Sequence, residues 1–295
     1  MHRRRTTIIA AVTGLVTAGL LLPAGPAHAA APYRLAVTFD GSLSASWLHV
    51  EGAGSAPTSA LSTLGTGTVT RTTWTTASIP SYVASVPGVV AGDQKVGVFP
   101  AYATTGTNFA AVKVTPTAFG VGNDVLAPGT KDLQFGADIK FNSPMPGTRP
   151  EDDGNNVIQR GRSANDQYKV QVDKQSNGTY KASCVLRDQG AVISDVVNDT
   201  SLVPSNWYRL LCTRTTVDGK DFVTLSVENL TAGTAPLLQS EDGLALTNLN
   251  YASATATSPF PVAIGAKVKD AGAIDPKSDQ FNGRIDNAYL AIDWP

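Results

Sequence analysis

Runs of alternating apolar and polar residues, each about the length of one β-strand, fill the stretch from residue 155 to residue 214. Turn-forming residues such as Asn177-Gly178 and Asp188-Gln189-Gly190 separate these runs. Because successive side chains of a strand point to opposite faces, the pattern predicts a meander of antiparallel strands. The five predicted strands are Asn156–Gly161, Gln167–Asp173, Tyr180–Arg187, Val192–Val197 and Trp207–Thr215.

The first 29 residues have the three parts of a secretory signal peptide. Arg3, Arg4 and Arg5 form a positive region, Ile8–Leu22 an apolar region, and Ala27-His28-Ala29 a cleavage site of small residues. The alternative is a retained membrane anchor, which a short segment ending in a cleavage pattern does not favour. We expect a mature chain of residues 30–295 that is secreted and stays extracellular or associated with the cell wall.

Loss of residues 1–29 removes three arginines and no acidic residue, which moves the formal net charge from −1 to −4. The remaining sequence has no basic tract and no basic amphipathic helix. Nucleic acid is therefore a poor partner for the mature chain. No later run is apolar enough to span a bilayer, so we expect no membrane insertion after cleavage. We further expect a monomer.

Cys184 and Cys212 are the two cysteines of the chain. Cys184 shares one face of its predicted strand with Tyr180, Ala182 and Leu186, so it faces the core. Two cysteines in an exported chain predict one disulfide, here between neighbouring strands. Two free buried thiols are the alternative. A redox or metal site is less favoured, because the chain has no Cys-x-x-Cys motif and no histidine nearby.

The residues from Leu133 to Phe141 alternate without a break, which predicts a half-buried strand with Phe135 and Ile139 in the core and Gln134 and Lys140 in solvent. Residues 231–250 are expected to be loop and short strand, and residues 51–66 either looped strand or disordered. No stretch shows a sustained helical period, so the chain is predicted to be an all-β sandwich. The further predicted strands are Tyr33–Phe39, Thr68–Thr76, Lys95–Phe99, Asn108–Thr115, Phe222–Glu228, Val262–Gly265 and Phe281–Trp294, the last with a bulge near Asp286.

Five segments carry a family resemblance: KDLQFGADIKF, NVIQRG, YKVQVD, NWYRLLCTRT and FNGRIDNAYLAI. Together they resemble the laminin-G-like domains of secreted actinobacterial proteins, which belong to the concanavalin A-like lectin and glucanase superfamily. The resemblance covers residues 131–295 well and residues 31–130 loosely. It implies a single antiparallel jelly-roll β-sandwich over residues 30–295. The fold alone does not fix a function, since such sandwiches serve as lectins, adhesion modules, enzymes and spacers.

No catalytic signature is present in the sequence. His49 is the one histidine outside the signal peptide, so a zinc site built on a histidine cluster is excluded. The Glu-x-Asp-x-x-Glu strand of related glucanases is absent, and Glu151-Asp152-Asp153 is an acidic loop. Related polysaccharide lyases carry Gln-Ile/Val-His on a central strand. Gln159 stands where the glutamine would be, but the histidine is missing, and the closing strand lacks the lyase Tyr-Phe-Lys-x-Gly pattern.

A row of polar side chains remains as the candidate ligand site. On a concave sheet face such side chains can hydrogen-bond the hydroxyl groups of sugars, whereas the plain alternative is an ordinary wet sheet face. The candidate ligand-binding residues are Gln134, Asp138, Lys140, Gln159, Arg160, Gln167, Lys169 and Gln171.

Asp40 and Asp286 are a candidate calcium site. Related sandwiches pair their first and closing strands, which would bring these two carboxylates together. Calcium prefers carboxylate and carbonyl oxygens, so we expect that a structural calcium ion could bind here, although no cofactor is required. The alternative is a surface aspartate at a bulge.

The sequence therefore predicts a secreted, non-catalytic binding module for an extracellular glycan or another cell-surface ligand. Two alternatives remain open: a polysaccharide lyase or hydrolase with an atypical site, and a structural surface protein.

Overall fold

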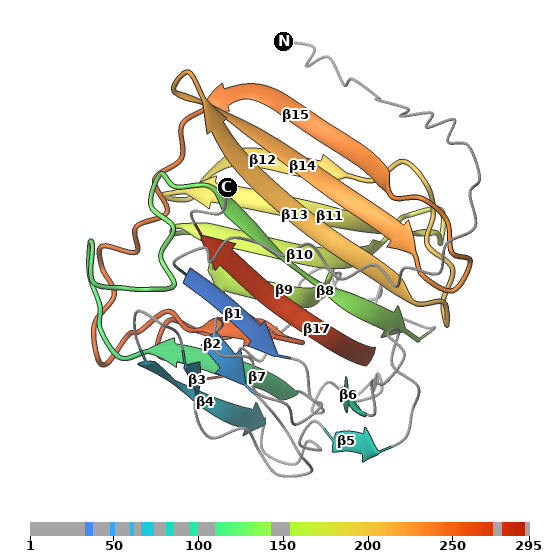
Figure 1. Ribbon diagram of the computed structural model, residues 1–295, viewed down its shortest axis with the longest axis horizontal. Helices are drawn as coiled ribbons and strands as arrows, with labels where there is room; N and C mark the ends of the chain where they lie inside the picture. Colours follow the sequence, from blue (N-terminus) through green and yellow to red (C-terminus); the bar gives the residue numbers. More distant parts are fainter. Residues whose placement is uncertain are drawn as a thin grey trace, which may run out of the picture.

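The structure is a computed structural model, and every secondary-structure element in its described part is a strand. It describes residues 33–37, 48–50, 60–61, 66–73, 81–84, 95–99, 110–142, 154–273 and 279–292. The strands form an antiparallel β-sandwich of the jelly-roll type (Figure 1). The strand pattern of the sequence predicts the sandwich, and the family resemblance implies the jelly roll.

Two curved layers of strands face each other (Figure 1). The front sheet consists, in spatial order, of β15 (Leu237–Ala245), β14 (Lys220–Asn229), β13 (Tyr208–Val217), β8 (Leu133–Phe141), β17 (Gly283–Ile292) and β1 (Tyr33–Val37). The back sheet consists of β12 (Ala191–Val197), β11 (Tyr180–Asp188), β10 (Gln167–Lys174), β9 (Gly154–Gly161), β16 (Val262–Ile264), β7 (Ala110–Pro116) and β4 (Thr66–Thr73).

Short strands connect the two sheets at one side. β2 (Leu48–Val50) pairs in parallel with β1, and β3 (Ala60–Leu61) joins β2 to β4. A hairpin of β5 (Ser81–Ala84) and β6 (Lys95–Val98) lies against β17. Strand pairing is therefore continuous from one sheet to the other, which leaves β12 and β15 as the terminal strands.

The predicted strands agree with the structure to within a few residues, except in one region. Residues 231–250, expected to be loop and short strand, contain the nine-residue strand β15. Its side chains are mostly exposed, because it is a terminal strand of the sandwich, so it lacks the apolar alternation that marks the other strands. The alternatives for residues 51–66 lie largely outside the described residues.

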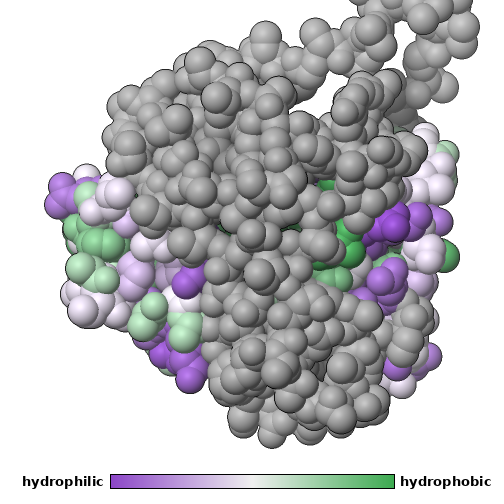
Figure 2. Space-filling model, turned by 90° about the horizontal axis from the view of Figure 1, so that it is seen from below, coloured by the Kyte–Doolittle hydropathy of each residue, from purple (hydrophilic) through white to green (hydrophobic). Residues whose placement is uncertain are grey.

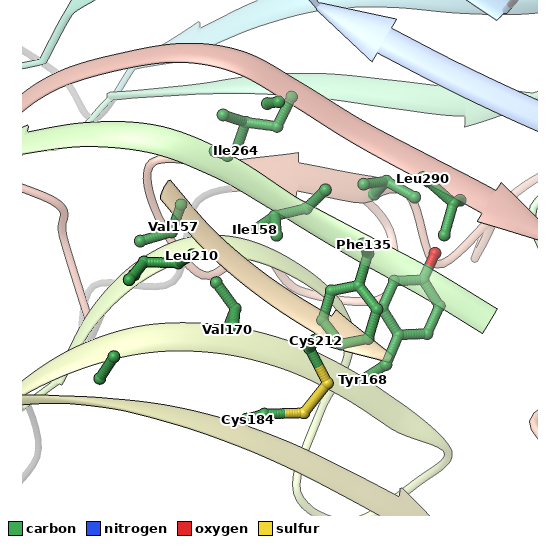
Figure 3. Packing of buried hydrophobic residues seen from close by; sticks show 14 of the residues in the cluster. Phe135, Val157, Ile158, Tyr168, Val170, Cys184, Leu210, Cys212, Ile264 and Leu290 are labelled. Atoms are coloured by element: carbon green, nitrogen blue, oxygen red, sulfur yellow. A yellow bond between two sulfur atoms is a disulfide. The ribbon is translucent and has the colours of Figure 1, made fainter. Parts of the chain in front are cut away.

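The core between the sheets is built from the inward side chains of both layers (Figure 3). Phe135 and Ile139 of β8 are fully buried, as their alternation predicts. The ring centroids of Phe135 and of Tyr168 on β10 are 5.0 Å apart, so these two side chains join the front and back sheets. Gln134 and Lys140, which point the other way, are partly exposed.

The predicted disulfide between Cys184 and Cys212 is present, with a Cα–Cα distance of 5.8 Å. The expectation that it joins neighbouring strands is wrong. Cys184 belongs to β11 of the back sheet and Cys212 to β13 of the front sheet, so the bond crosses the core (Figure 3). Both cysteines lie on the inward face of their strands, and β11 and β13 belong to facing sheets, so the two side chains meet in the core between the layers.

The closing strand β17 pairs with β1 on one side and with β8 on the other. Its register with β8 shifts between Asp286 and Tyr289, and Asn287 has a left-handed backbone with φ of 47°. The bulge predicted near Asp286 is therefore confirmed. It turns Asp286 and Tyr289 to the outer face while Ile285 and Leu290 stay in the core.

Candidate functional site

The structure divides the predicted ligand-binding residues among three places. Gln134, Asp138 and Lys140 lie on the outer face of the front sheet, because they alternate with the core residues of β8. Arg160 points into the interior between the sheets. The outer face of the back sheet holds the remaining four, which are Gln159, Gln167, Lys169 and Gln171.

Asp138 on the front sheet is engaged in an ion pair. It is buried, and its two carboxylate oxygens accept hydrogen bonds from Nε and Nη2 of Arg209 at 2.8 and 2.9 Å. Asn287 Nδ2 at the β17 bulge donates a third, at 3.1 Å. The hydrogen bonds to Asp138 are the largest cause of the raised pKa of Arg209. This set of contacts ties β8, β13 and β17 together and uses up the hydrogen-bonding capacity that a ligand would need.

Asp286 of the predicted calcium site is buried and stands opposite Asp138 in the β8–β17 register. Its predicted partner Asp40 lies outside the described residues. Within the described part of the chain, no group of three or more acidic, histidine or cysteine side chains could hold a metal ion. The calcium site therefore stays a prediction.

Arg160 is fully buried, although it follows Gln159 directly. Adjacent residues of a strand face opposite sides, so the outward position of Gln159 sends Arg160 inward. There Arg160 Nη2 pairs with Asp124, its Nε donates to the Phe260 carbonyl at 2.7 Å, and the guanidinium stacks on the Tyr251 ring at 4.0 Å.

Four side chains that point from β9 and β10 to the side away from the core form what we call the amide face: Asn156, Gln159, Lys169 and Gln171. Lys169 is partly exposed and the other three are buried. Asn156 is the cross-strand partner of Gln171, and Gln159 is the partner of Lys169. Asn156 Nδ2 donates to Gln159 Oε1 at 2.6 Å, and Gln159 Nε2 donates to the Gly161 carbonyl at 2.6 Å. These bonds hold the side chains of Asn156 and Gln159 in one orientation along β9.

Acidic side chains at the border of the amide face orient its other members. Gln171 Nε2 donates to Asp173 Oδ2 at 2.9 Å, and Ser183 Oγ on β11 donates to the same oxygen at 2.8 Å. Asp279 forms an ion pair with Lys267 at 3.3 Å and accepts a long hydrogen bond of 3.5 Å from Asn156. The amide nitrogens of Asn156 and Gln171 are thus held by protein acceptors.

The amide oxygens of the same two residues are not satisfied. Asn156 Oδ1 and Gln171 Oε1 are buried atoms without a hydrogen-bond partner. An unsatisfied buried acceptor costs about 1–3 kcal/mol, so most such groups in folded proteins have a partner, protein or water. Two of them on directly paired residues therefore mark a place where a hydrogen-bond donor from outside would be stabilised.

Lys169 supplies the complementary group. Its ammonium makes no hydrogen bond or close ion pair with the described residues, and burial is the main cause that lowers its pKa. The more distant charges of Asp279 and Asp173 oppose this shift without cancelling it. The amide face therefore combines two free acceptors with one free donor, which is the pattern that a ligand with several hydroxyl groups can satisfy.

Sequence reasoning missed Asn156 for a specific reason. Counting back by two from Gln159 predicts that Val157 points outward. A bulge in β9 shifts the register between Ile158 and Asn156, so Val157 turns into the core and Asn156 takes the outward position. Two side chains of the border were missed because they come from distant segments, Ser183 on β11 and Asp279 before β17.

Figure 2 shows hydrophilic residues, with small groups of hydrophobic residues among them, on the described surface seen from below. The large hydrophobic side chains that are exposed belong to several different elements. No helix in the described part of the chain is long and apolar enough to cross a membrane.

Comparisons with known proteins found likenesses of structure alone. No family model matches the sequence, and no curated protein matches it either. Tailspike protein 2 of Escherichia coli O157:H7 bacteriophage CAB120 is similar over 76% of this chain, with 14% identity and a TM-score of 0.49. The chain spans 26% of that tailspike protein.

Two further solved structures are similar at lower TM-scores. A SAP-like pentraxin from Limulus polyphemus matches 65% of this chain and 73% of its own, with 14% identity and a TM-score of 0.37. Alginate lyase Aly36B matches 89% of this chain and 98% of its own, with 10% identity and a TM-score of 0.38. At these identities the comparisons do not assign an activity to this chain.

Proposed function

We propose that the protein is a secreted, non-catalytic module that binds an extracellular glycan through the amide face. The observation that carries this proposal is the pair of unsatisfied buried acceptors, Asn156 Oδ1 and Gln171 Oε1, beside the unpaired ammonium of Lys169. A sugar hydroxyl both donates and accepts hydrogen bonds, so neighbouring hydroxyls of one sugar can satisfy all three groups. Charged ligands without hydroxyls would satisfy Lys169 and leave the acceptors unpaired.

The protein scaffold supports binding because it holds the amide face in one shape. Asn156 and Gln171 lie on paired strands, and Asp173 and Asp279 fix their amide nitrogens, so the site needs little ordering when a ligand arrives. Three of the four residues of the amide face are neutral amides, which serve as hydrogen-bond donors and acceptors, and Lys169 is the one that titrates.

The binding test uses a panel of cell-wall and plant polysaccharides with the mature protein, followed by calorimetry on the best polymer. Lys169→Met and Gln171→Ala should each weaken binding roughly tenfold, the usual effect of losing a hydrogen bond that involves a charge or leaves a buried partner unpaired. Gln134→Ala is the matched control, because Gln134 is an outward residue of the opposite sheet. Absence of binding across the panel, or equal affinity in all three variants, would refute the proposal.

One observation favours a second candidate, a polysaccharide-active enzyme. A lysine whose pKa is lowered by burial is a candidate general base. Incubation of the same polymers with the protein, followed by assays for reducing and unsaturated ends, distinguishes the two functions. Chain cleavage that is lost in Lys169→Met would replace the binding proposal with an enzymatic one. If the protein neither binds nor cleaves any polymer, a structural role at the cell surface remains.

A further inference from the structure

A second candidate site lies at one end of the sandwich, away from the amide face. It is a pocket of about 260 Å³ formed by three connecting segments. Asn165 and Asp166 come from the β9–β10 turn, Gln189 from the β11–β12 turn, and Tyr251 and Ser253 from the loop between β15 and β16. We call it the Asp166 pocket. Its volume is below the roughly 300–1,000 Å³ of pockets for drug-sized ligands, so it suits one small ring.

The backbone around this pocket is strained. Six non-glycine residues of the described chain have positive φ, and three of them, Gln189, Tyr251 and Phe260, line the pocket with φ of 47–49°. A left-handed conformation costs about 1 kcal/mol or more for such residues, and it persists only where the surroundings enforce it. Strain of this kind gathers at sites that must hold a fixed shape.

Asp166 enforces that shape from the side of the pocket. Its Oδ1 accepts a hydrogen bond from the backbone N–H of Gln189 at 3.0 Å, and its Oδ2 accepts one from the backbone N–H of Tyr251 at 3.0 Å. Two of the three strained residues are therefore held by one carboxylate. The floor is equally fixed, because the Tyr251 hydroxyl donates to the Arg160 carbonyl at 3.2 Å and its ring stacks on the Arg160 guanidinium.

The charge of the pocket is unbalanced. Asp166 is buried and forms no ion pair within the described chain. Arg160 pairs with Asp124 and Arg162 with Asp270, and Arg187 at the β11–β12 turn donates to the Gly190 carbonyl at 3.5 Å. The side chains of Asn165, Gln189 and Ser253, which also line the pocket, are uncharged, and among the residues that the structure describes they have no side-chain hydrogen-bond partner. A buried carboxylate without a counter-ion favours a cationic ligand, and free amide and hydroxyl oxygens around it can accept the remaining protons.

We infer that the Asp166 pocket binds the protonated primary amine of an amino sugar. The ammonium group would lie against Asp166 and donate to the oxygens of Asn165 and Ser253. Tyr251 and Phe260 are aromatic residues of the pocket lining and favour a sugar ring over a bare ion, since they supply an apolar border beside the charged group. This site is separate from the amide face and does not depend on the function proposed there.

The test compares glucosamine with N-acetylglucosamine, and chitosan oligomers with fully acetylated chitin oligomers, by NMR titration at pH 6. The acetylated partner has the same ring without the charge. We expect the free amines to bind at least roughly tenfold more tightly, as a charge-assisted hydrogen bond predicts, and binding to weaken with added salt. Asp166→Asn should remove the preference.

Asp166 also orders the loops around the pocket, so its replacement could disturb the fold there. A second pair of variants therefore tests the pocket while Asp166 is kept. Ala252→Trp places a large side chain at the pocket wall and should abolish binding of the amines. Ala256→Trp is the matched control, an exposed alanine of the same loop that does not line the pocket. Equal binding of free and acetylated sugars, no binding of either, or full binding in Ala252→Trp would each overturn the inference. Lys169→Met should leave amine binding unchanged, so failure here and failure at the amide face are distinguishable.

Discussion

Charged residues inside the sandwich have specific partners. Arg160 pairs with Asp124, and Arg214 donates to Thr247 Oγ1 at 2.6 Å and to the Gly129 carbonyl at 3.1 Å. Asp221 completes the second group by accepting from Thr247 Oγ1 at 2.6 Å. Burial lowers the pKa of Arg214, which shows that these partners offset only part of the desolvation. Each group joins a loop to a strand of the core.

Removal of Asp124 should destabilise the protein strongly. Asp124→Ala leaves the Arg160 guanidinium buried without its counter-ion, which typically costs about 3–5 kcal/mol. The matched control is Asp270→Ala, which breaks the Arg162–Asp270 pair, a partly exposed one. That pair should contribute within about 1 kcal/mol. Urea unfolding of both variants measures the difference, and equal losses would show that the interior pair is no more important than the exposed one.

Lys169 should destabilise the unliganded protein. Its folded-state pKa is lowered by burial, so the charged form, present below that pKa, costs stability in the folded state. Lys169→Met should therefore raise the melting temperature at pH 7. The gain should shrink as pH rises through the lowered pKa toward 10.5, because the wild-type lysine then loses its charge on folding. A lower melting temperature for Lys169→Met than for the wild type at pH 7 would contradict the conclusion that the Lys169 charge destabilises the folded state.

At the scale of the element, sequence reasoning succeeded where alternation is unbroken and failed where it is not. β8 was predicted with its observed bounds, and the phase slip in β17 correctly indicated a bulge. The bulge in β9 has no such signal, because Asn156, Val157 and Ile158 give no clear alternation to violate. Nor can periodicity tell which sheet a strand joins. The predicted polar row was therefore divided between opposite faces, with β8 in one sheet and β9 and β10 in the other.

The register of β8 gives a direct stability test. Phe135→Ala and Ile139→Ala remove fully buried side chains and should each cost about 2–5 kcal/mol. Gln134→Ala on the other face of the same strand should change stability by no more than about 0.5 kcal/mol. Denaturant midpoints in the opposite order would mean that the strand is displaced by one residue, since a slip of one residue exchanges the two faces.

For the whole molecule, a disulfide and an aromatic contact join the two sheets across the core. The Cys184–Cys212 bond joins front to back across 28 residues of sequence, which contributes about 3–4 kcal/mol in the chain-entropy treatment. The Phe135–Tyr168 contact connects the same two layers. The amide face therefore lies on a sheet that is fixed to the rest of the core.

Calcium bound between the first and closing strands is expected to stabilise the whole fold. β1 pairs with β17 as that prediction requires, and Asp286 is buried on β17. If Asp40 and Asp286 share an ion, about 10 mM calcium should raise the free energy of unfolding by about 1–3 kcal/mol over chelator. Thermal melts measure this, and Asp286→Asn should remove the effect. Identical melts with calcium and with chelator would leave Asp286 as a structural aspartate.

The most direct test of the proposed glycan-binding face is an NMR titration with the best-binding oligosaccharide. It follows the chemical shifts of the backbone and side-chain amides. The account predicts shifts concentrated on outward residues of β9, β10 and β11, including the side-chain amides of Asn156 and Gln171, with β8 and β13 unchanged. Shifts centred on Gln134 and Lys140 of the front sheet, or a saturating titration that moves no resonance of the amide face, would contradict it.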